Sequence, residues 1–203
     1  MTVHKLTTPI TEEQVRKLKV GDTIFVTGRV VTARDRAHKR ALEYVKVGKA
    51  LPITFEGIAI FHCGPIAVKE EKGWRIVAAG PTTSTRMESF EDEFIEKLKP
   101  RVIIGKGGMG SRTVQAAKKF GAIYCDFTGG AALLAAERIK RVEGVEWFDL
   151  GMPEALWIFE VEDFGPTTVT IDTYGNNLHE TIDRDAEQRK REIFKSLGLS
   201  ATS

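Results

Sequence analysis

The stretch that decides the fold class is VIIGKGGMGSRTVQAAKKFGAIYCDF, residues 102–127. It opens with the apolar run Val102–Ile104, which is typical of a buried strand. A glycine-rich turn follows, and a helix is predicted from about Ser111 to Phe120. A second strand is predicted at Ala122–Tyr124. Strands that alternate with helices in this way indicate an α/β arrangement of layers.

The same signals extend toward the N-terminus. The elements expected there are a short helix opened by Thr11–Gln14, strands at Thr23–Gly28, Ile58–Phe61 and Trp74–Ala78, and helices at Ala33–Val47 and Glu88–Leu98. The alternation of strands and helices therefore covers the first half of the chain as well.

Toward the C-terminus the rhythm changes. The expected elements are a helix from about Gly130 to Arg141, then strands at Val145–Phe148, Ala155–Val161 and Thr167–Ile171. Because the last two strands follow each other closely, the sheet should be partly antiparallel, or a second sheet should form. We expect one domain, residues 1–180, with a mixed sheet flanked by helices. A charged tail, residues 181–203, follows, with a helix at Arg184–Leu197.

Composition narrows the class of protein. The 203 residues are 42% hydrophobic and 29% charged, as in soluble globular proteins, which excludes fibrous and disordered chains. Lys and Arg number 30 and Asp and Glu 28, so net charge gives no reason to expect a nucleic-acid or membrane-surface partner. No apolar run reaches the roughly 20 residues of a membrane helix. No signal sequence is recognisable, so we expect a cytoplasmic location. Cys63 and Cys125 are too few for a disulfide framework or a cysteine-ligated metal site.

Polar clusters recur where a predicted strand passes into a helix. The four clusters are residues 32–38, 80–86, 105–110 and 126–130. Ligands of open α/β sheets bind outside the carboxyl ends of strands, where helix N-termini supply free N–H groups. Three clusters add a cation, namely Arg34 or Arg36, Arg86, and Lys106. The sequence therefore predicts a site for a small anion with more than one negative group.

Other interpretations of these residues exist. Each arginine taken alone could be solvated or paired with a local acid such as Asp35 or Glu88. Gly105, Gly107 and Gly110 form G-x-G-x-x-G after a strand, with Asp126 closing the next strand, as in a dinucleotide-binding module. Against that interpretation, about half of the chain precedes the motif.

Catalytic groups are scarce. The four histidines have no spacing that recommends a hydrolase triad. His62 and Cys63 could form a reactive pair, but the favoured interpretation is that Cys63 is a small buried residue and His62 a hydrogen-bonded wall of the site. The hydroxyls of residues 82–85 are weak bases unless an electrophile acidifies the substrate proton. This chain carries no such electrophile, so it should come from elsewhere.

Several motifs together resemble a known family. They are Thr-Ala-Arg-Asp-Arg-Ala-His (32–38), His-Cys-Gly-Pro (62–65), Gly-Pro-Thr-Thr-Ser-Thr-Arg-Met-Glu (80–88), Ile-Gly-Lys-Gly-Gly-Met-Gly (104–110), Leu-Gly-Met-Pro-Glu-Ala-Leu-Trp (150–157), Asp-Phe-Gly-Pro (163–166) and Gly-Asn-Asn-Leu (175–178). In this order they resemble the β subunit of two-subunit class I hydro-lyases, the iron-sulfur fumarate hydratases and L(+)-tartrate dehydratases.

The resemblance implies a swivelling β/β/α domain that works with an α subunit, in an α2β2-type assembly. The α subunit would carry a 4Fe-4S cluster, to which this chain contributes no ligand. The implied reaction is reversible hydration of fumarate to L-malate. Conversion of tartrate to oxaloacetate remains the alternative, because the two kinds of β subunit share nearly all these motifs.

The resemblance also implies roles for individual residues. Thr82 would be the general base, and Arg34, Arg86 and Lys106 would bind the carboxylates of a small dicarboxylate substrate. Arg34 is favoured over Arg36 as the carboxylate ligand, although both arginines lie within one turn of the same motif and the choice between them stays open. The residues expected to form walls of the site are His38, His62, Gly107 and Asp126.

Overall fold

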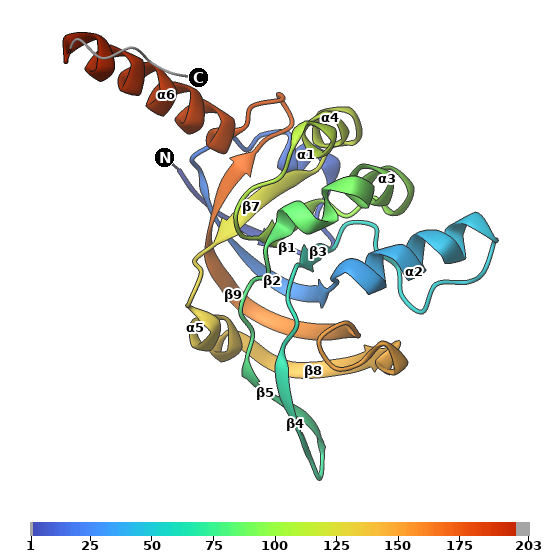
Figure 1. Ribbon diagram of the computed structural model, residues 1–203. Coiled ribbons are helices and arrows are strands. Elements are labelled where there is room, and N and C mark those ends of the chain that lie inside the picture. Colours follow the sequence, from blue (N-terminus) through green and yellow to red (C-terminus); the bar gives the residue numbers. More distant parts are fainter. Residues whose placement is uncertain (1, 198–203) are drawn as a thin grey trace.

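The computed structural model describes residues 2–197 as a curved sheet with helices on its outer side (Figure 1). The strands are β1 (Val3–Thr7), β2 (Thr23–Thr32), β3 (Ala59–Phe61), β4 (Ile66–Glu70), β5 (Gly73–Ala78), β6 (Val102–Gly105), β7 (Ile123–Phe127), β8 (Ile139–Glu146) and β9 (Leu156–Ile171). The helices are α1 (Glu12–Val15), α2 (Asp35–Lys46), α3 (Glu88–Leu98), α4 (Ser111–Phe120), α5 (Ala132–Glu137) and α6 (Leu178–Ser196).

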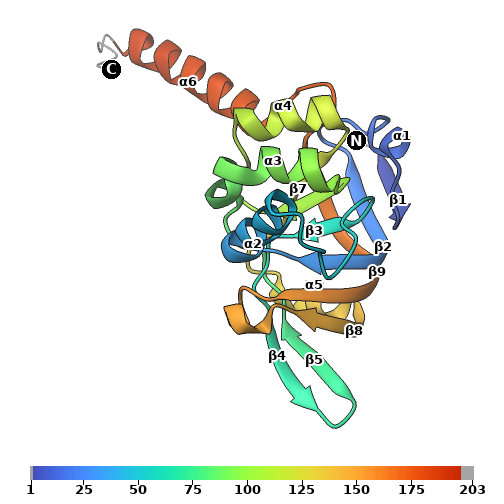
Figure 2. The same ribbon diagram turned by 90° about the vertical axis from the view of Figure 1, so that its right-hand side faces the viewer.

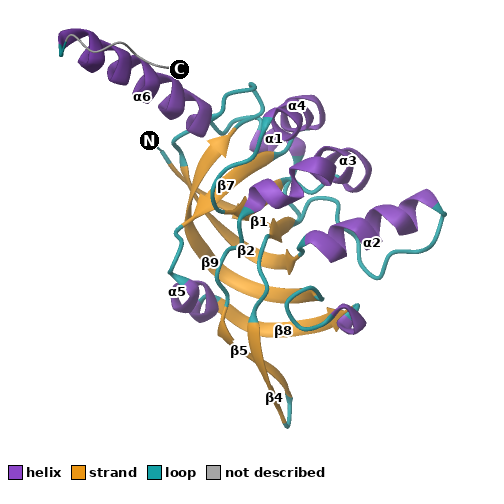
Figure 3. Cartoon of the chain, viewed as in Figure 1, coloured by secondary structure: helices purple, strands orange, loops and turns teal. Residues whose placement is uncertain are grey.

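The main sheet is mixed, as the sequence predicted. Its strand order is β1-β2-β3-β6-β7-β9-β8. The first five of these strands run parallel to one another, whereas β9 is antiparallel to β7, β8 and β2. Because β9 pairs with both β7 and β2, the strands β2, β3, β6, β7 and β9 close into a ring. The short hairpin β4–β5 forms a separate two-stranded sheet (Figure 3).

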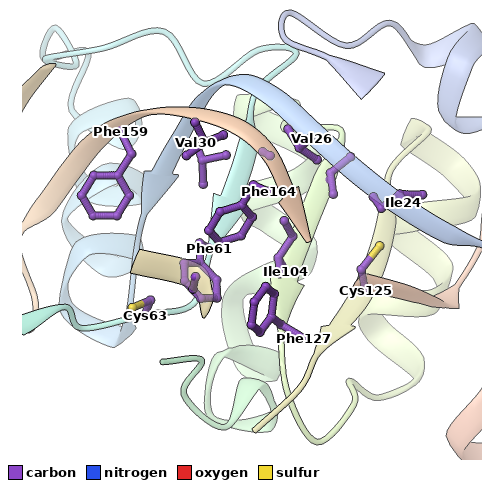
Figure 4. Close-up of a cluster of buried hydrophobic side chains, with 14 of the residues drawn as sticks. Ile24, Val26, Val30, Phe61, Cys63, Ile104, Cys125, Phe127, Phe159 and Phe164 are labelled. Atoms are coloured by element: carbon purple, nitrogen blue, oxygen red, sulfur yellow. The ribbon is translucent and has the colours of Figure 1, made fainter. Parts of the chain in front are cut away.

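Alternation along the strands divides the apolar residues between two sides. Ile104 and Cys125 point to the inside of the ring, where Phe61, Phe127 and Phe164 pack together (Figure 4). Their neighbours point outward, and these side chains are covered by the helices. Ile60 packs with residues of α2 and α3, and Ile103 and Tyr124 pack with residues of α3 and α4. The period of two that defines a strand therefore builds an interior core and an outer layer.

Two elements differ from the prediction near the C-terminal end of the domain. The expected strands at 155–161 and 167–171 are parts of the single strand β9, which runs through Asp163 and Gly165 while it follows β2. The helix expected to reach Arg141 ends at Glu137, because the residues from Ile139 onward pair with β9 as strand β8. In both places pairing with a distant strand overrides the local signal.

The C-terminal helix α6 projects from the body in both views (Figures 1 and 2). It begins at Leu178, six residues before the expected start, and none of its side chains is buried. Within residues 2–197, no helix is both long and apolar enough to cross a membrane.

Candidate functional site

The parallel strands β2, β3, β6 and β7 end at one edge of the sheet. Thr32, Phe61, Ile104 and Cys125 are paired across these strands, so the residues that follow them lie at the same level. The polar clusters after β2, β6 and β7 therefore meet at this edge, as predicted, and the His62–Gly64 turn after β3 joins them. Ligands of α/β sheets bind at this kind of edge.

The segment that carries Thr82 arrives from the separate β4–β5 hairpin and crosses this edge. The Thr82 N–H donates a 2.6 Å hydrogen bond to the carbonyl of His62, and Thr83 forms a parallel bridge with Lys106. The Ser84 N–H donates to the carbonyl of Lys106 over 2.9 Å. Thr82 is therefore held between the ends of β3 and β6, in the middle of the edge.

Arg34 and Arg36 lie in different environments. Nε of Arg34 is 3.3 Å from Oε1 of Glu154, and its side chain is 19% exposed. A Cβ atom added to Gly64 would lie 2.7 Å from Nη1 of Arg34, so the guanidinium rests against the turn after β3. The exposed Arg36 instead donates to the carbonyl of Leu150 over 3.2 Å. Of the two arginines, Arg34 lies against the His62–Gly64 turn.

Arg86 and Lys106 complete the group of cations. Arg86 pairs with Asp35, the residue that follows Arg34, so the first and second clusters are joined by an ion pair. The Lys106 side chain runs toward the fourth cluster, where its Cδ would be 3.7 Å from a Cβ atom on Gly129. Within the described residues Lys106 has no ion-pair partner, which leaves its ammonium group available to an anion.

The glycine-rich turn is filled by the chain itself. The carboxylate of Glu88 accepts hydrogen bonds from the N–H groups of Gly110 and Arg112, at 2.7 and 3.0 Å, at the N-terminus of α4. A Cβ atom on Gly110 would be 2.7 Å from Glu88, and one on Gly105 would be 1.9 Å from Oγ of Ser84. These two glycines therefore make room for the 82–88 segment. In a dinucleotide-binding module the helix N-terminus would hold a pyrophosphate, and here a carboxylate occupies that place.

Asp126 is not a free acid. It is ion-paired with His179 of α6 and accepts a 3.1 Å hydrogen bond from the hydroxyl of Tyr124. His179 also lies against Gly108, where an added Cβ atom would be 2.8 Å from Cδ2 of His179. The φ of +74° at this position also favours glycine. Gly107 is exposed at the same turn. No spacing in the sequence indicated that His179 would meet Asp126.

His38 and His62 lie beneath the edge and are completely buried, together with Glu91 of α3. Nε2 of His38 is 3.4 Å and Nε2 of His62 is 3.2 Å from Oε2 of Glu91. Sequence reasoning missed Glu91, although a signal was present. Glu91 precedes Phe94, Ile95 and Leu98 by three, four and seven residues, so a carboxylate stands on the apolar stripe of the helix.

Neither cysteine can serve the site. Cys63 and Cys125 are completely buried and point into the ring, away from the strand-end edge (Figure 4). Burial raises the pKa of both thiols well above the ordinary value, whereas a metal ligand must be a thiolate. The donors at the edge are cations and a hydroxyl, so the residues of this chain do not fit an iron-sulfur cluster.

Comparisons with known proteins give the family. The family model described as Fumarase C-terminus matches residues 2–182. The chain is 49% identical, over 85% of each chain, to the L(+)-tartrate dehydratase subunit beta of Escherichia coli. It is 40% identical, over 91% of this chain and 95% of the relative, to a Methanocaldococcus jannaschii protein provisionally named L(+)-tartrate dehydratase subunit beta.

A third relative is longer. It is a Geobacillus stearothermophilus protein provisionally named fumarate hydratase class I, 43% identical over 92% of this chain. The matched region is 35% of that protein. The family model covers most of the described chain and all of the strand-end edge, and the resemblance inferred from the motifs is confirmed. The chain belongs to the Fumarase C-terminus family.

Proposed function

We propose that this chain is the β subunit of a two-subunit hydro-lyase that interconverts fumarate and L-malate. The observation that carries the proposal is the placement of Thr82 at one sheet edge with Arg34, Arg86 and Lys106 around it. The names of the relatives, tartrate dehydratase and fumarate hydratase, support a hydro-lyase reaction.

The three cations suit a small dianion. Each is delivered by a different element: Arg34 precedes α2, Arg86 precedes α3, and Lys106 precedes α4. Two carboxylates bound at separate points fix the substrate in one orientation, which lowers the entropic part of the barrier. The same cations stabilise the negative charge that develops on a carboxylate when the neighbouring carbon loses its proton.

Thr82 is the proposed base in the malate-to-fumarate direction. Its Oγ1 would remove a proton from C3 of malate while the hydroxyl at C2 departs. A threonine hydroxyl is a weak base, but cations nearby favour its ionised form, and exclusion of water by a partner strengthens that effect. His62 and Lys106 hold its segment through backbone contacts, so the backbone at Thr82 has a fixed position.

The proposal includes a partner. The word "beta" in the names of the relatives supports an α subunit for this chain, and we propose an α2β2 assembly. An iron-sulfur cluster would belong to that subunit, where it supplies a Lewis acid for the departing hydroxyl. This chain contributes the base and the carboxylate-binding groups, and none of the cluster ligands.

A second candidate is L(+)-tartrate dehydration. The 49% identity to the tartrate dehydratase subunit favours it, and tartrate has the same two carboxylates with one more hydroxyl. Both candidates use the same four residues, so they differ only in the substrate that the complex prefers.

The experiment uses the complex of this chain with its cluster-bearing α subunit, purified without oxygen. Thr82→Val removes the hydroxyl and keeps the shape of the side chain. We expect kcat for malate dehydration to fall by about 10²- to 10⁴-fold, the usual contribution of a general base. Thr83→Val is the matched control, because Thr83 is exposed and next in sequence. The kcat of the Thr83→Val complex should stay within about threefold of the wild-type value, which is less than the tenfold change that about 1.4 kcal/mol represents.

Two results would contradict parts of this proposal. Full activity of the Thr82→Val complex, with its cluster intact, would remove Thr82 as the base. A higher kcat/KM for L(+)-tartrate than for L-malate would make tartrate dehydration the function. The chain without its partner should turn over neither substrate.

A further inference from the structure

Three completely buried polar side chains meet beneath the edge of the sheet. His38 comes from the first turn of α2, His62 from the end of β3, and Glu91 from the first turn of α3. The two imidazole rings are 5.2 Å apart and nearly perpendicular, and the ring of Phe94 packs 4.3 Å from that of His38. The ionisable atoms of the three residues lie within 4.8 Å of one another.

Glu91 is charged in this setting. Burial alone would raise the pKa of Glu91, but the neighbouring His38 and His62 outweigh it and lower that pKa to about 2. A buried carboxylate is costly unless a cation or hydrogen-bond donors face it. Both carboxylate oxygens of Glu91 and both Nε2 atoms are buried, and none of them has a hydrogen-bond partner within the described residues. Their nearest polar contacts are the separations of 3.4 and 3.2 Å between the two Nε2 atoms and Oε2 of Glu91. The three side chains therefore have to satisfy one another.

The other ring nitrogens fix where the protons are. Nδ1 of His38 is 2.9 Å from the carbonyl oxygen of Arg34. A carbonyl only accepts, so Nδ1 must carry a proton. Nε2 of the same ring faces the carboxylate of Glu91, which also only accepts, so a second proton is required there. Both ring nitrogens of His38 therefore face acceptor oxygens, which is the arrangement that an imidazolium would satisfy.

His62 completes the arrangement without a charge. Burial lowers the pKa of His62, so the neutral ring is favoured, although Glu91 opposes the shift. Its Nδ1 is 2.9 Å from Oγ of Ser84, and a hydroxyl can donate to it. Its Nε2 then carries the proton that points to Glu91. One carboxylate, one imidazolium and one neutral imidazole give a net charge of zero.

The two histidines are attached to groups that the proposed function uses. The carbonyl of Arg34 accepts hydrogen bonds from the backbone N–H and from the ring Nδ1 of His38. The carbonyl of His62 accepts a hydrogen bond from the N–H of Thr82. The hydroxyl of Ser84 contacts His62 and also accepts from the N–H of Lys106 over 3.3 Å. The buried cluster thus links the backbones at Arg34, Thr82 and Lys106, which come from three separate parts of the chain.

We propose that His38, Glu91 and His62 form a proton-sharing clamp that sets the relative positions of Arg34, Thr82 and Lys106. The role in catalysis rests on the proposed function, whereas the protonation state of the clamp does not. The three side chains touch no substrate; they are positioning residues. Glu91 is the central member, because the Nε2 atoms of both imidazoles lie 3.4 and 3.2 Å from its Oε2.

A divalent metal ion fits this cluster less well. With one carboxylate it would leave a net positive charge in a sealed site beside Arg34. Structural zinc takes four ligands, and the described residues at this site supply three. A shared proton balances the charge and needs no fourth ligand.

The first measurement needs no substrate. The ring ¹⁵N resonances of the full chain at neutral pH should show both nitrogens of His38 protonated and those of His62 in the neutral form. In Glu91→Gln, which keeps the shape and removes the charge, the His38 ring should become neutral. Neutral His38 in the wild type, or one equivalent of zinc or iron bound by the chain expressed alone, would overturn the clamp.

The second measurement tests positioning in the α-subunit complex. Glu91→Gln should lower kcat/KM by at least tenfold, whereas the exposed Glu93→Gln of the same helix should leave it unchanged. In a Thr82→Val background the Glu91→Gln change should lower kcat by less than twofold. Glu91 acts by positioning Thr82, so its loss has little further effect once the Thr82 hydroxyl is absent. If the double variant lost kcat by the product of the two single-variant losses, the proposal would be overturned. A wild-type complex inactive toward fumarate, malate and tartrate would refute the proposed function, while the ¹⁵N measurement would still decide the clamp.

Discussion

Arg34 and Arg36 show how two residues of one motif can be separated by their contacts. The Arg34 side chain is only 19% exposed, with Glu154 on one side and the Gly64 turn on the other. Arg36 is exposed. Its backbone N–H donates to the carboxylate of Glu154, and its guanidinium donates to the carbonyl of Leu150. A guanidinium fixed by surrounding groups can bind a carboxylate with little loss of side-chain entropy.

This difference predicts unequal effects of the same substitution. In the complex, Arg34→Lys should raise KM for malate by about tenfold, which corresponds to the 1.4 kcal/mol expected for one weakened charged hydrogen bond. Arg36→Lys should change KM by less than about twofold, because it lies outside the proposed site. Steady-state kinetics on the two variants decides between them. The opposite order of effects would assign the carboxylate to Arg36.

The sequence indicated the residues that face the site better than the residues beneath it. Arg34, Thr82, Arg86 and Lys106 follow strands or precede helices, and strand ends are visible in a pattern of apolar runs. Glu91 and His179 act through partners that are distant in sequence, namely His62 and Asp126. A pattern read along one chain shows which face of a helix is apolar, but it does not show which other element that face will meet.

Helix α4 shows how one side chain from another element can define where a helix begins. Its own N-cap is Gly110, which has no side chain to accept a hydrogen bond. Glu88, the first residue of α3, supplies that acceptor, and it also accepts from the hydroxyl of Thr113 over 2.7 Å. The negative charge of Glu88 also lies at the positive end of the α4 dipole.

We therefore expect Glu88→Ala to lower the free energy of unfolding of the full chain by about 1–3 kcal/mol, the range for lost charged hydrogen bonds. Glu93→Ala, in the same helix but exposed, should change it by less than about 0.5 kcal/mol. Urea unfolding of the two variants gives the comparison. If Glu88→Ala were as mild as the control, the start of α4 would not depend on this contact.

Most elements could be predicted from local pattern, although strands β1 and β4 were not, and the two differences near the C-terminal end of the domain have a common cause. Helices α3 and α4 have the bounds that apolar spacing predicted. Strand β9 was expected as two strands, at 155–161 and 167–171. In the structure β2 holds it as one strand with local shifts of register, and the N–H of Asp163 donates to Oγ1 of Thr27 over 3.1 Å. Pairing with an element far away in sequence cannot be read from a local window.

At the scale of the whole molecule, the charged side chains are distributed unevenly although the net charge is close to zero. The chain has 30 basic and 28 acidic residues, yet three cations gather at one edge of the sheet. Many charged side chains elsewhere on the described surface are paired with neighbours of opposite charge, such as Arg40 with Asp149 and Arg112 with Asp92. An anion-binding edge can therefore form without a net charge that would attract nucleic acid or membranes.

The described chain also divides into a packed body and a projecting helix, and this division can be measured (Figure 2). Helix α6 is attached at its start, where the side chain of Asn177 donates to the carbonyl of Met109 over 3.0 Å and caps the helix.

Asn177→Ala should lower the free energy of unfolding of the full chain by about 1–2 kcal/mol, since a buried hydrogen bond and a cap are both lost. Ile193 is 56% exposed on the same helix, so Ile193→Ala should change it by less than about 0.5 kcal/mol. Urea unfolding at two protein concentrations tests both expectations. A loss at Ile193 as large as that at Asn177 would show that α6 packs along its length, and a loss that grows with protein concentration would place that packing between chains.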